Sequence, residues 1–201
     1  MRIQPECIPC ILNMTVSSLR LLALDEPRIR EILSEILRFP AVMEMTSDPT
    51  SPELIEQVMT VISETLGDPD PFRAEKKRQN DLLLKAYPRL KDRIQNSGNP
   101  FRDAVQLAIL GNAVDFMMAQ SPGDVEAFLV EKLKTPLLEE RTGELRNRLS
   151  RTRLLLYFAD NCGEIVLDKL LIETIRNEFN PKIILVVRRN PSLNDATLAE
   201  A

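Results

Sequence analysis

Hydrophobic positions form two different patterns along this chain of 201 residues. Before residue 150 they recur every three or four residues, as on one side of a helix, and residues 52–66 show this spacing most clearly. Residues 154–158 and 182–187 are instead short continuous apolar runs, which are typical of buried parallel strands. The pattern predicts an α-helical subdomain over residues 1–150 and a strand-helix-strand unit over residues 151–201.

Capping residues and prolines mark where several helices begin. Pro52 follows Ser51 and Pro100 follows Asn99, and proline at the first helical position loses nothing by lacking an N–H. We therefore expect Ser51 and Asn99 to cap helices. Residues 46–52 are expected to form a loop, and residues 141–151 to join the two parts of the chain.

Polar side chains follow both predicted strands. Asp160 and Asn161 come directly after the run at residues 154–158, and Asp195 follows the run at residues 182–187 after a short loop. The carboxyl ends of parallel strands meet at one edge of a sheet, so these residues can come together there. Two carboxylates and an amide oxygen, with waters in the remaining positions, suit Mg²⁺ or Mn²⁺. The alternative is that Asp160 or Asn161 only caps the helix that begins near Glu164.

Composition narrows the chemistry and the partners. The chain has no histidine, so the usual zinc ligand and the usual general base are absent. A net charge of −4 without a basic stripe argues against nucleic-acid binding, and the basic run at residues 76–78 is expected on a solvated helix face. The sequence has no apolar stretch of about 20 residues and no signal peptide, so we expect a cytoplasmic protein without a membrane partner.

Cys7 and Cys10 form a Cys-x-x-Cys pair with three interpretations. A structural zinc site needs four ligands, so it would have to be shared with further sequence or another subunit. A redox pair at a helix start would have a lowered thiol pKa. The simplest interpretation is that both cysteines pack as small apolar residues. Cys162, next to Asn161, either acts as a nucleophile or fits a tight turn.

Five motifs together resemble the metal-dependent damage-control phosphatase family, also called acidic-residue-methyltransferase-like. In chain order they are Cys-Ile-Pro-Cys at residues 7–10, Asp-Pro-Phe at 70–72 with Lys76 and Asn80, Gly-Asn-Ala-Val-Asp at 111–115, Phe-Ala-Asp-Asn-Cys-Gly-Glu at 158–164 and Asn-Asp-Ala-Thr at 194–197. The early Cys-x-x-Cys resembles that of one subgroup of the family.

The resemblance implies an α/β fold, with a Rossmann-like parallel-sheet domain after the helical subdomain. It implies a divalent cation held by Asp160, Asn161 and Asp195, with Mg²⁺ or Mn²⁺ expected first and Co²⁺ or Ni²⁺ as alternatives. The implied activity is hydrolysis of small phosphorylated metabolites, such as sugar phosphates or damaged phosphometabolites. An oligomer is compatible with these features.

Roles for further residues follow from this expected reaction. Water activated by the metal would attack the phosphoryl group, and N–H groups at the start of the following helix would bind phosphate. Glu164 is expected to orient the water or the substrate, and Arg188 either pairs with the phosphate or is a surface charge. Glycine within an apolar helix, as at Gly111, usually marks close packing. The resemblance adds the alternative that Asn112 borders the active site.

Two other functions remain open from the sequence. One is methyl transfer from S-adenosylmethionine to protein carboxylates, which is disfavoured because the loop after the first strand has a single glycine. The other is a non-catalytic, metal-dependent metabolite binder. Members of the family continue past the position of Ala201, and two strands are too few to bury both faces of a sheet. We therefore expect the α/β domain to continue beyond the given chain.

Overall fold

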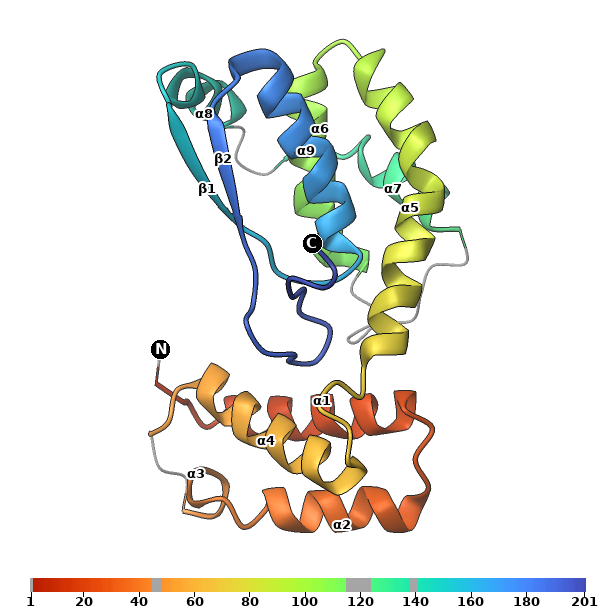
Figure 1. Cartoon of the computed structure of the whole chain (residues 1–201), viewed down its shortest axis with the longest axis vertical. Helices are drawn as coiled ribbons and strands as arrows, with labels where there is room; N and C mark the ends of the chain where they lie inside the picture. The colour runs from red at the N-terminus through yellow and green to blue at the C-terminus, as the bar shows by residue number, and fades with distance from the viewer. Residues whose placement is uncertain (1, 45–47, 115–123, 138–140) are drawn as a thin grey trace. The chain divides into compact units, whose positions relative to one another are not determined.

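The computed structural model describes residues 2–44, 48–114, 124–137 and 141–201, which divide into two compact units (Figure 1). The first unit consists of Met1–Ala74 with Asn190–Asn194, and the second of Glu75–Arg189 with Asp195–Ala201. The boundary between these units lies at other residues than the boundary between the predicted domains. The predicted domain boundary at residues 150–151 stays a prediction.

The first unit is built from helices. They are α1 (Cys7–Leu21), α2 (Glu26–Ile36), α3 (Pro40–Met43) and α4 (Ser51–Leu66). Thr50 and Glu53 form a capping box at the start of α4, and Gly67 ends this helix in the left-handed conformation, with a φ of 66°. The N-cap is therefore Thr50, one residue before the predicted Ser51. Of the loop expected at residues 46–52, the last two residues are helical, and residues 46 and 47 lie outside the described part.

The second unit combines helices with a parallel sheet. Its elements are α5 (Arg73–Gln95), which begins at the end of the first unit, α6 (Pro100–Gly111), the 3₁₀ turn η1 (Asn112–Val114), α7 (Val125–Lys132), α8 (Thr142–Leu149), β1 (Leu154–Phe158), α9 (Glu164–Phe179) and β2 (Lys182–Val186). Asn99 caps α6 as predicted, because its side chain accepts a hydrogen bond from the N–H of Arg102. The expected junction at residues 141–151 contains the helix α8.

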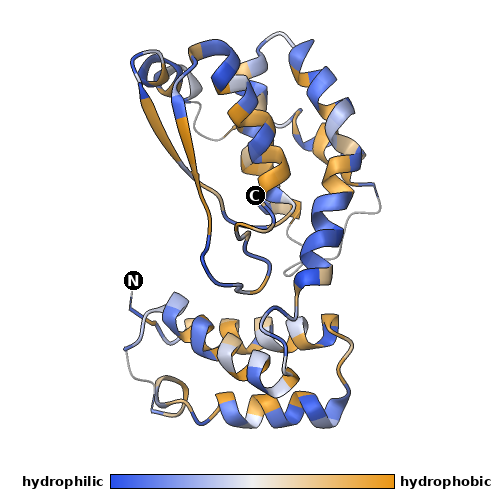
Figure 2. Cartoon of the chain, in the orientation of Figure 1, coloured by the Kyte–Doolittle hydropathy of each residue, from blue (hydrophilic) through white to orange (hydrophobic). Residues whose placement is uncertain are grey.

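Strands β1 and β2 pair in parallel, and the helix α9 connects them in the sequence. The predicted strand-helix-strand unit and the α/β class are therefore confirmed. Leu154 pairs with Lys182, and the register continues to Phe158 opposite Val186. Residues alternate between the two faces of β1, and Figure 2 shows that both strands are largely hydrophobic. One face packs on the core, whereas the side chains of the other face are exposed, including Phe158 at 72%. An uncovered apolar face is what a sheet of this size predicts.

Helix α9 is the centre of the second unit. It packs along α6 (Figure 1), and the rings of Phe101 and Phe179 meet edge to face with centroids 5.6 Å apart. Leu167, Leu170 and Ile175 of α9 are buried in this core. Packing against α6 therefore fixes the position of α9 in the second unit. Across the described residues, none of the helices combines the length and the apolarity needed to cross a membrane.

Candidate functional site

The turn between β1 and α9 is shaped by Gly163. This residue has a φ of 84°, in the left-handed region that side chains disfavour, and it is the N-cap of α9. Because the N-cap is a glycine, neither Asp160 nor Asn161 occupies that position, so the alternative that one of them only caps the helix is wrong. Cys162 is buried in the core beneath the turn, which agrees with a packing role.

Backbone pairing brings Asp195 to the end of β1. Asn161 and Asp195 form an isolated antiparallel bridge, and the N–H of Ala196 donates to the carbonyl oxygen of Asp160 at 2.7 Å. The structure thus places all three predicted ligand residues side by side. Their role as metal ligands stays a prediction.

The carboxyl group of Asp195 lies in an unusual electrostatic environment. Burial raises its pKa to about 6, and the negative charge of Asp160 adds to this rise, whereas the charge of Arg188 opposes it. Nε of Arg188 lies 2.9 Å from Oδ2 of Asp195, so these side chains form an ion pair. The two carboxylates repel each other, and a cation bound between them would reduce this repulsion.

The donor set fits a hard divalent cation. In the described ranges, no cluster of three or more His, Cys, Asp and Glu side chains is arranged to hold a metal ion. A cation at the sheet edge would therefore use Asp160 and Asp195 together with the amide oxygen of Asn161 and waters. Mg²⁺ and Mn²⁺ accept such oxygen ligands and commonly retain waters.

Glu164 is held beside this sheet edge by the end of α6. Nδ2 of Asn112 donates a hydrogen bond to Oε1 of Glu164 at 2.9 Å. A Cβ atom added to Gly111 would lie only 2.7 Å from Cγ of Glu164. The predicted close packing at Gly111 is confirmed, and the side chain that approaches it is Glu164. Asp115, the last residue of the Gly-Asn-Ala-Val-Asp motif, lies outside the described residues.

N–H groups at the start of α9 already have acceptors within the protein. Gly163 donates to Oδ1 of Asn80 at 2.6 Å, Ile165 to the carbonyl oxygen of Asn161, and Val166 to that of Gly163. The expectation that these groups bind phosphate is therefore wrong for these three. Asn80 has instead a structural task, since it holds the turn that carries the predicted ligands.

Several residues near the site have roles that were not predicted from the sequence. Lys76, expected on a solvated helix face, is completely buried and pairs with Glu200. Tyr157 donates a hydrogen bond to the buried Asp168. For Lys76 a signal existed, because it lies on the buried stripe of α5 that continues through Gln79 and Leu83.

The cysteine pair belongs to the first unit. Cys10 is exposed, which contradicts the interpretation that both cysteines pack as apolar residues. Hydrogen bonds from Ser51 and from the N–H of Gln4 lower the pKa of the Cys7 thiol. The redox and metal interpretations remain predictions.

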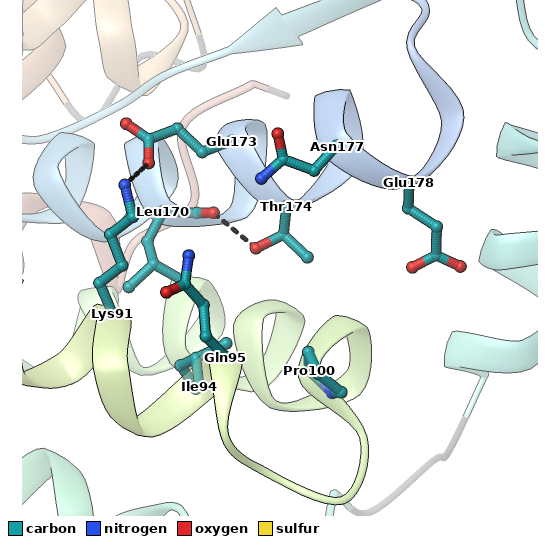
Figure 3. Close-up of a pocket in the computed structure, with 9 residues that line it drawn as sticks. All are labelled: Lys91, Ile94, Gln95, Pro100, Leu170, Glu173, Thr174, Asn177 and Glu178. Carbon is teal, nitrogen blue, oxygen red and sulfur yellow. Dashed lines mark hydrogen bonds and ion pairs between the residues drawn. The ribbon is translucent and has the colours of Figure 1, made fainter.

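Two cavities in the second unit are not lined by the predicted ligands themselves. One of about 260 Å³ is lined by residues of α5, α6 and α9, among them Lys91, Gln95 and Glu173 (Figure 3). A larger one of about 700 Å³ follows α9 and β2. Neither lining includes Asp160 or Asp195, so the chemistry of the side chains, and not cavity size, indicates the site.

Comparisons with known proteins give the family. The chain matches the model of the damage-control phosphatase ARMT1-like domain over residues 3–201. It is 28% identical over 201 residues to a damage-control phosphatase of Pyrococcus horikoshii and 31% identical over 205 residues to one of Archaeoglobus fulgidus. These matches cover 100% of this chain but 68% and 69% of those proteins. A crystal structure of a DUF89 family protein from Pyrococcus horikoshii is similar with a TM-score of 0.82 at 27% identity, covering 100% of this chain and 69% of that one. The chain therefore belongs to the damage-control phosphatase ARMT1-like family, and this membership supports a phosphatase role.

Proposed function

We propose that the protein hydrolyses small phosphorylated metabolites, such as sugar phosphates or damaged phosphometabolites, and depends on a divalent cation. The observation that carries this proposal is the backbone pairing that holds Asp160 and Asn161 beside Asp195. Membership of the family supports the reaction class.

Asp160, Asn161 and Asp195 would hold the cation, with Mg²⁺ or Mn²⁺ preferred and Co²⁺ or Ni²⁺ as alternatives. When bound, such a cation supplies positive charge to phosphoryl oxygens and makes a water more acidic. The three side chains contribute at most two negative charges, which balance the two positive charges of the cation. The guanidinium group of Arg188, paired with Asp195, adds a positive charge, so the site as a whole would attract a phosphate group. Burial is the main cause of the raised pKa of Asp195, and the charge of Asp160 adds to it; a cation between the two carboxylates would relieve this part of the repulsion.

Glu164 would act on the nucleophile. Its Oε1 accepts a hydrogen bond from Nδ2 of Asn112, which fixes the direction of the carboxylate. A carboxylate in this position can orient a water, accept its proton or hold a substrate hydroxyl.

Arg188 would link the ligand shell to the substrate. It pairs with Asp195 through Nε, and its side chain is 53% exposed. A guanidinium group carries five N–H donors, so it can hold Asp195 and direct other donors to a phosphate oxygen.

A phosphate-release screen tests this function. The protein is treated with a chelator and then assayed on a panel of phosphorylated sugars and metabolites with Mg²⁺, Mn²⁺, Co²⁺ or Ni²⁺. Asp160→Asn keeps the shape of the side chain but removes a charge. We expect turnover to fall by at least about 100-fold, since even changes to residues behind metal ligands cost about 10- to 100-fold.

Asp81→Asn is a matched control, because Asp81 is an exposed carboxylate on α5 that pairs with Lys77. It should release phosphate as the wild type does. Both variants should unfold at the same urea concentration as the wild type within experimental error. Phosphate release that is insensitive to chelation, or normal turnover by Asp160→Asn, would show that the proposal is wrong.

A further inference from the structure

Lys76 occupies a position that normally belongs to an apolar residue. Its side chain is 0% exposed, whereas the side chain of its neighbour Lys77 is 74% exposed. It lies on the buried stripe of α5 with Gln79, Leu83 and Ala86. A buried lysine must be compensated by an anion, because removing an ammonium group from water costs several kcal/mol.

The anion is Glu200, in the segment that follows Asp195. Nζ of Lys76 lies 2.9 Å from Oε1 of Glu200, whose side chain is only 10% exposed. Oε2 of the same carboxylate accepts hydrogen bonds from the N–H of Thr197 at 2.9 Å and from its hydroxyl at 2.7 Å. Both oxygens of Glu200 are thus engaged, one by α5 and one by the loop that carries Asp195.

This loop is tied to the sheet edge at its other end. The N–H of Ala196 donates to the carbonyl oxygen of Asp160 at 2.7 Å, and the carbonyl oxygen of Ala196 accepts from the N–H of Arg188 at 3.0 Å. Burial raises the pKa of Asp195, and the charges of Arg188 and Lys76 oppose that rise. Lys76 is therefore within electrostatic reach of Asp195.

A buried ion pair is a poor means of stabilising a fold, because the cost of desolvating both charges offsets most of their attraction. Two apolar residues of similar size would fill the same space. What an ion pair adds is geometry, since it fixes the distance and direction between the groups that carry it. Here those groups are the first turns of α5 and the loop of residues 195–200.

We propose that the Lys76–Glu200 ion pair is a positioning device that holds the loop of residues 195–200, and with it the carboxylate of Asp195, beside Asp160. Its effect on cation binding rests on the proposed function, whereas its effect on the loop does not. The two residues act through Asp195 and do not touch the substrate.

Hydrogen exchange measures the effect on the loop without any metal. Glu200→Gln keeps the size of the side chain and an oxygen that Thr197 can bond, but it removes the charge that pairs with Lys76. We expect the amides of Ala196 and Thr197 to exchange about 10-fold faster or more in this variant, while amides in the core of α9 exchange as in the wild type. Lys76→Met should have the same local effect.

The double variant Lys76→Met/Glu200→Gln separates positioning from charge balance. It leaves no unpaired buried charge, so its unfolding midpoint should lie closer to that of the wild type than those of the single variants. Fast exchange at Ala196 should persist, because the link between α5 and the loop is still broken. If the loop regains the protection of the wild type, charge balance alone matters and the positioning role is refuted. Unchanged exchange in Glu200→Gln would refute it as well. This variant alone decides the question if Lys76→Met does not fold.

Titration with Mn²⁺ measures the consequence for the site. Relative to the wild type, we expect Glu200→Gln to bind Mn²⁺ about 10- to 100-fold more weakly, as other changes behind metal ligands do. Lys77→Met is the matched control, since it removes the adjacent, exposed lysine of α5, and it should keep wild-type affinity. A wild type that binds no divalent cation would refute the proposed metal dependence, while the exchange experiment would still decide the positioning role. Wild-type Mn²⁺ affinity in Glu200→Gln, with a wild type that does bind, would refute the link between the ion pair and Asp195.

Discussion

Gly111 makes room for Glu164: a Cβ atom at position 111 would lie 2.7 Å from Cγ of Glu164 and 3.2 Å from its Cβ. Any larger residue there must displace the glutamate. Asn112, the next residue, bonds the carboxylate of the same glutamate. The end of α6 therefore fixes both where Glu164 lies and how it is oriented.

Replacing Gly111 with alanine should disturb catalysis more than stability. The added methyl group costs about 1–3 kcal/mol by overpacking, which the better helix propensity of alanine offsets by about 1 kcal/mol. The displaced carboxylate should lose its bond to Asn112, so we expect turnover to fall by about 100-fold, the lower end of the effect of a positioned acid or base group. Steady-state phosphate release and urea unfolding measure the two effects.

Gly143→Ala is the control for this variant. Gly143 lies inside α8, and a Cβ atom added there would meet no other atom within 4 Å. It should gain up to about 1 kcal/mol of stability and keep its turnover. Equal kinetics for both variants would mean that the placement of Glu164 is not important for the reaction.

Asn80 supports the turn that carries Asp160 and Asn161. Its Oδ1 accepts the N–H of Gly163 at 2.6 Å, and Asn80→Ala leaves that N–H without its acceptor. We expect a loss of about 1–3 kcal/mol in the free energy of unfolding. Asn96→Ala, which removes an exposed side chain just after the end of α5, should change it by no more than about 0.5 kcal/mol. Similar losses in both variants would contradict a special role for Asn80.

Signals that are local in sequence predicted much of the fold. The run at residues 154–158 became β1 with the predicted bounds, and β2 ended one residue earlier than predicted. The rule that parallel strands end at the same edge placed Asp195 beside Asn161. These successes share one cause: strand periodicity and sheet edges depend on nearby residues and on a strongly restricted topology.

Contacts between distant segments could not be predicted in the same way. The spacing along α5 indicates that Lys76 is on the buried side, but nothing near it in the sequence indicates its partner Glu200, which lies near the other end of the chain. Asn80 belongs to one of the motifs, but nothing near it in the sequence shows that it binds Gly163. Both residues bind polar groups of distant segments, namely the carboxylate of Glu200 and the N–H of Gly163. Their roles are therefore visible only in the folded structure.

Cys7 should be more reactive than an ordinary cysteine thiol. Hydrogen bonds from Ser51 and from the N–H of Gln4 lower its pKa, so more of it is thiolate at neutral pH. Iodoacetamide should therefore alkylate Cys7 faster than a cysteine in an unstructured peptide at pH 7, as followed by mass spectrometry. Ser51→Ala should slow the reaction, and Thr60→Ala on the same helix should not. A rate that Ser51→Ala leaves unchanged would exclude this hydrogen bond as the cause.

The hydrogen bond between Tyr157 and Asp168 joins β1 to α9 on either side of the candidate site. The Tyr157 hydroxyl donates to Oδ1 of Asp168 at 2.5 Å, and Asp168 is 3% exposed. Burial raises the pKa of Asp168 from 3.8 to about 6, against the effect of the hydrogen bond from Tyr157 and with that of the charge on Asp160. Asp168 therefore changes its charge within an accessible range of pH.

The stability of the protein should reflect this titration. Between about pH 4 and pH 6 the folded protein holds a proton on Asp168 that the unfolded chain has lost, so the stability contributed by this group is greatest at low pH and falls as pH rises through this range. Asp168→Asn cannot titrate and still offers an oxygen to Tyr157. The unfolding free energy of the variant, relative to that of the wild type, should therefore rise by about 2–3 kcal/mol from pH 4 to pH 7, since each unit of pKa shift corresponds to about 1.4 kcal/mol. Urea unfolding at a series of pH values measures this difference directly. Free energies that change in parallel for the two proteins would show that Asp168 has the same pKa in the folded and unfolded states.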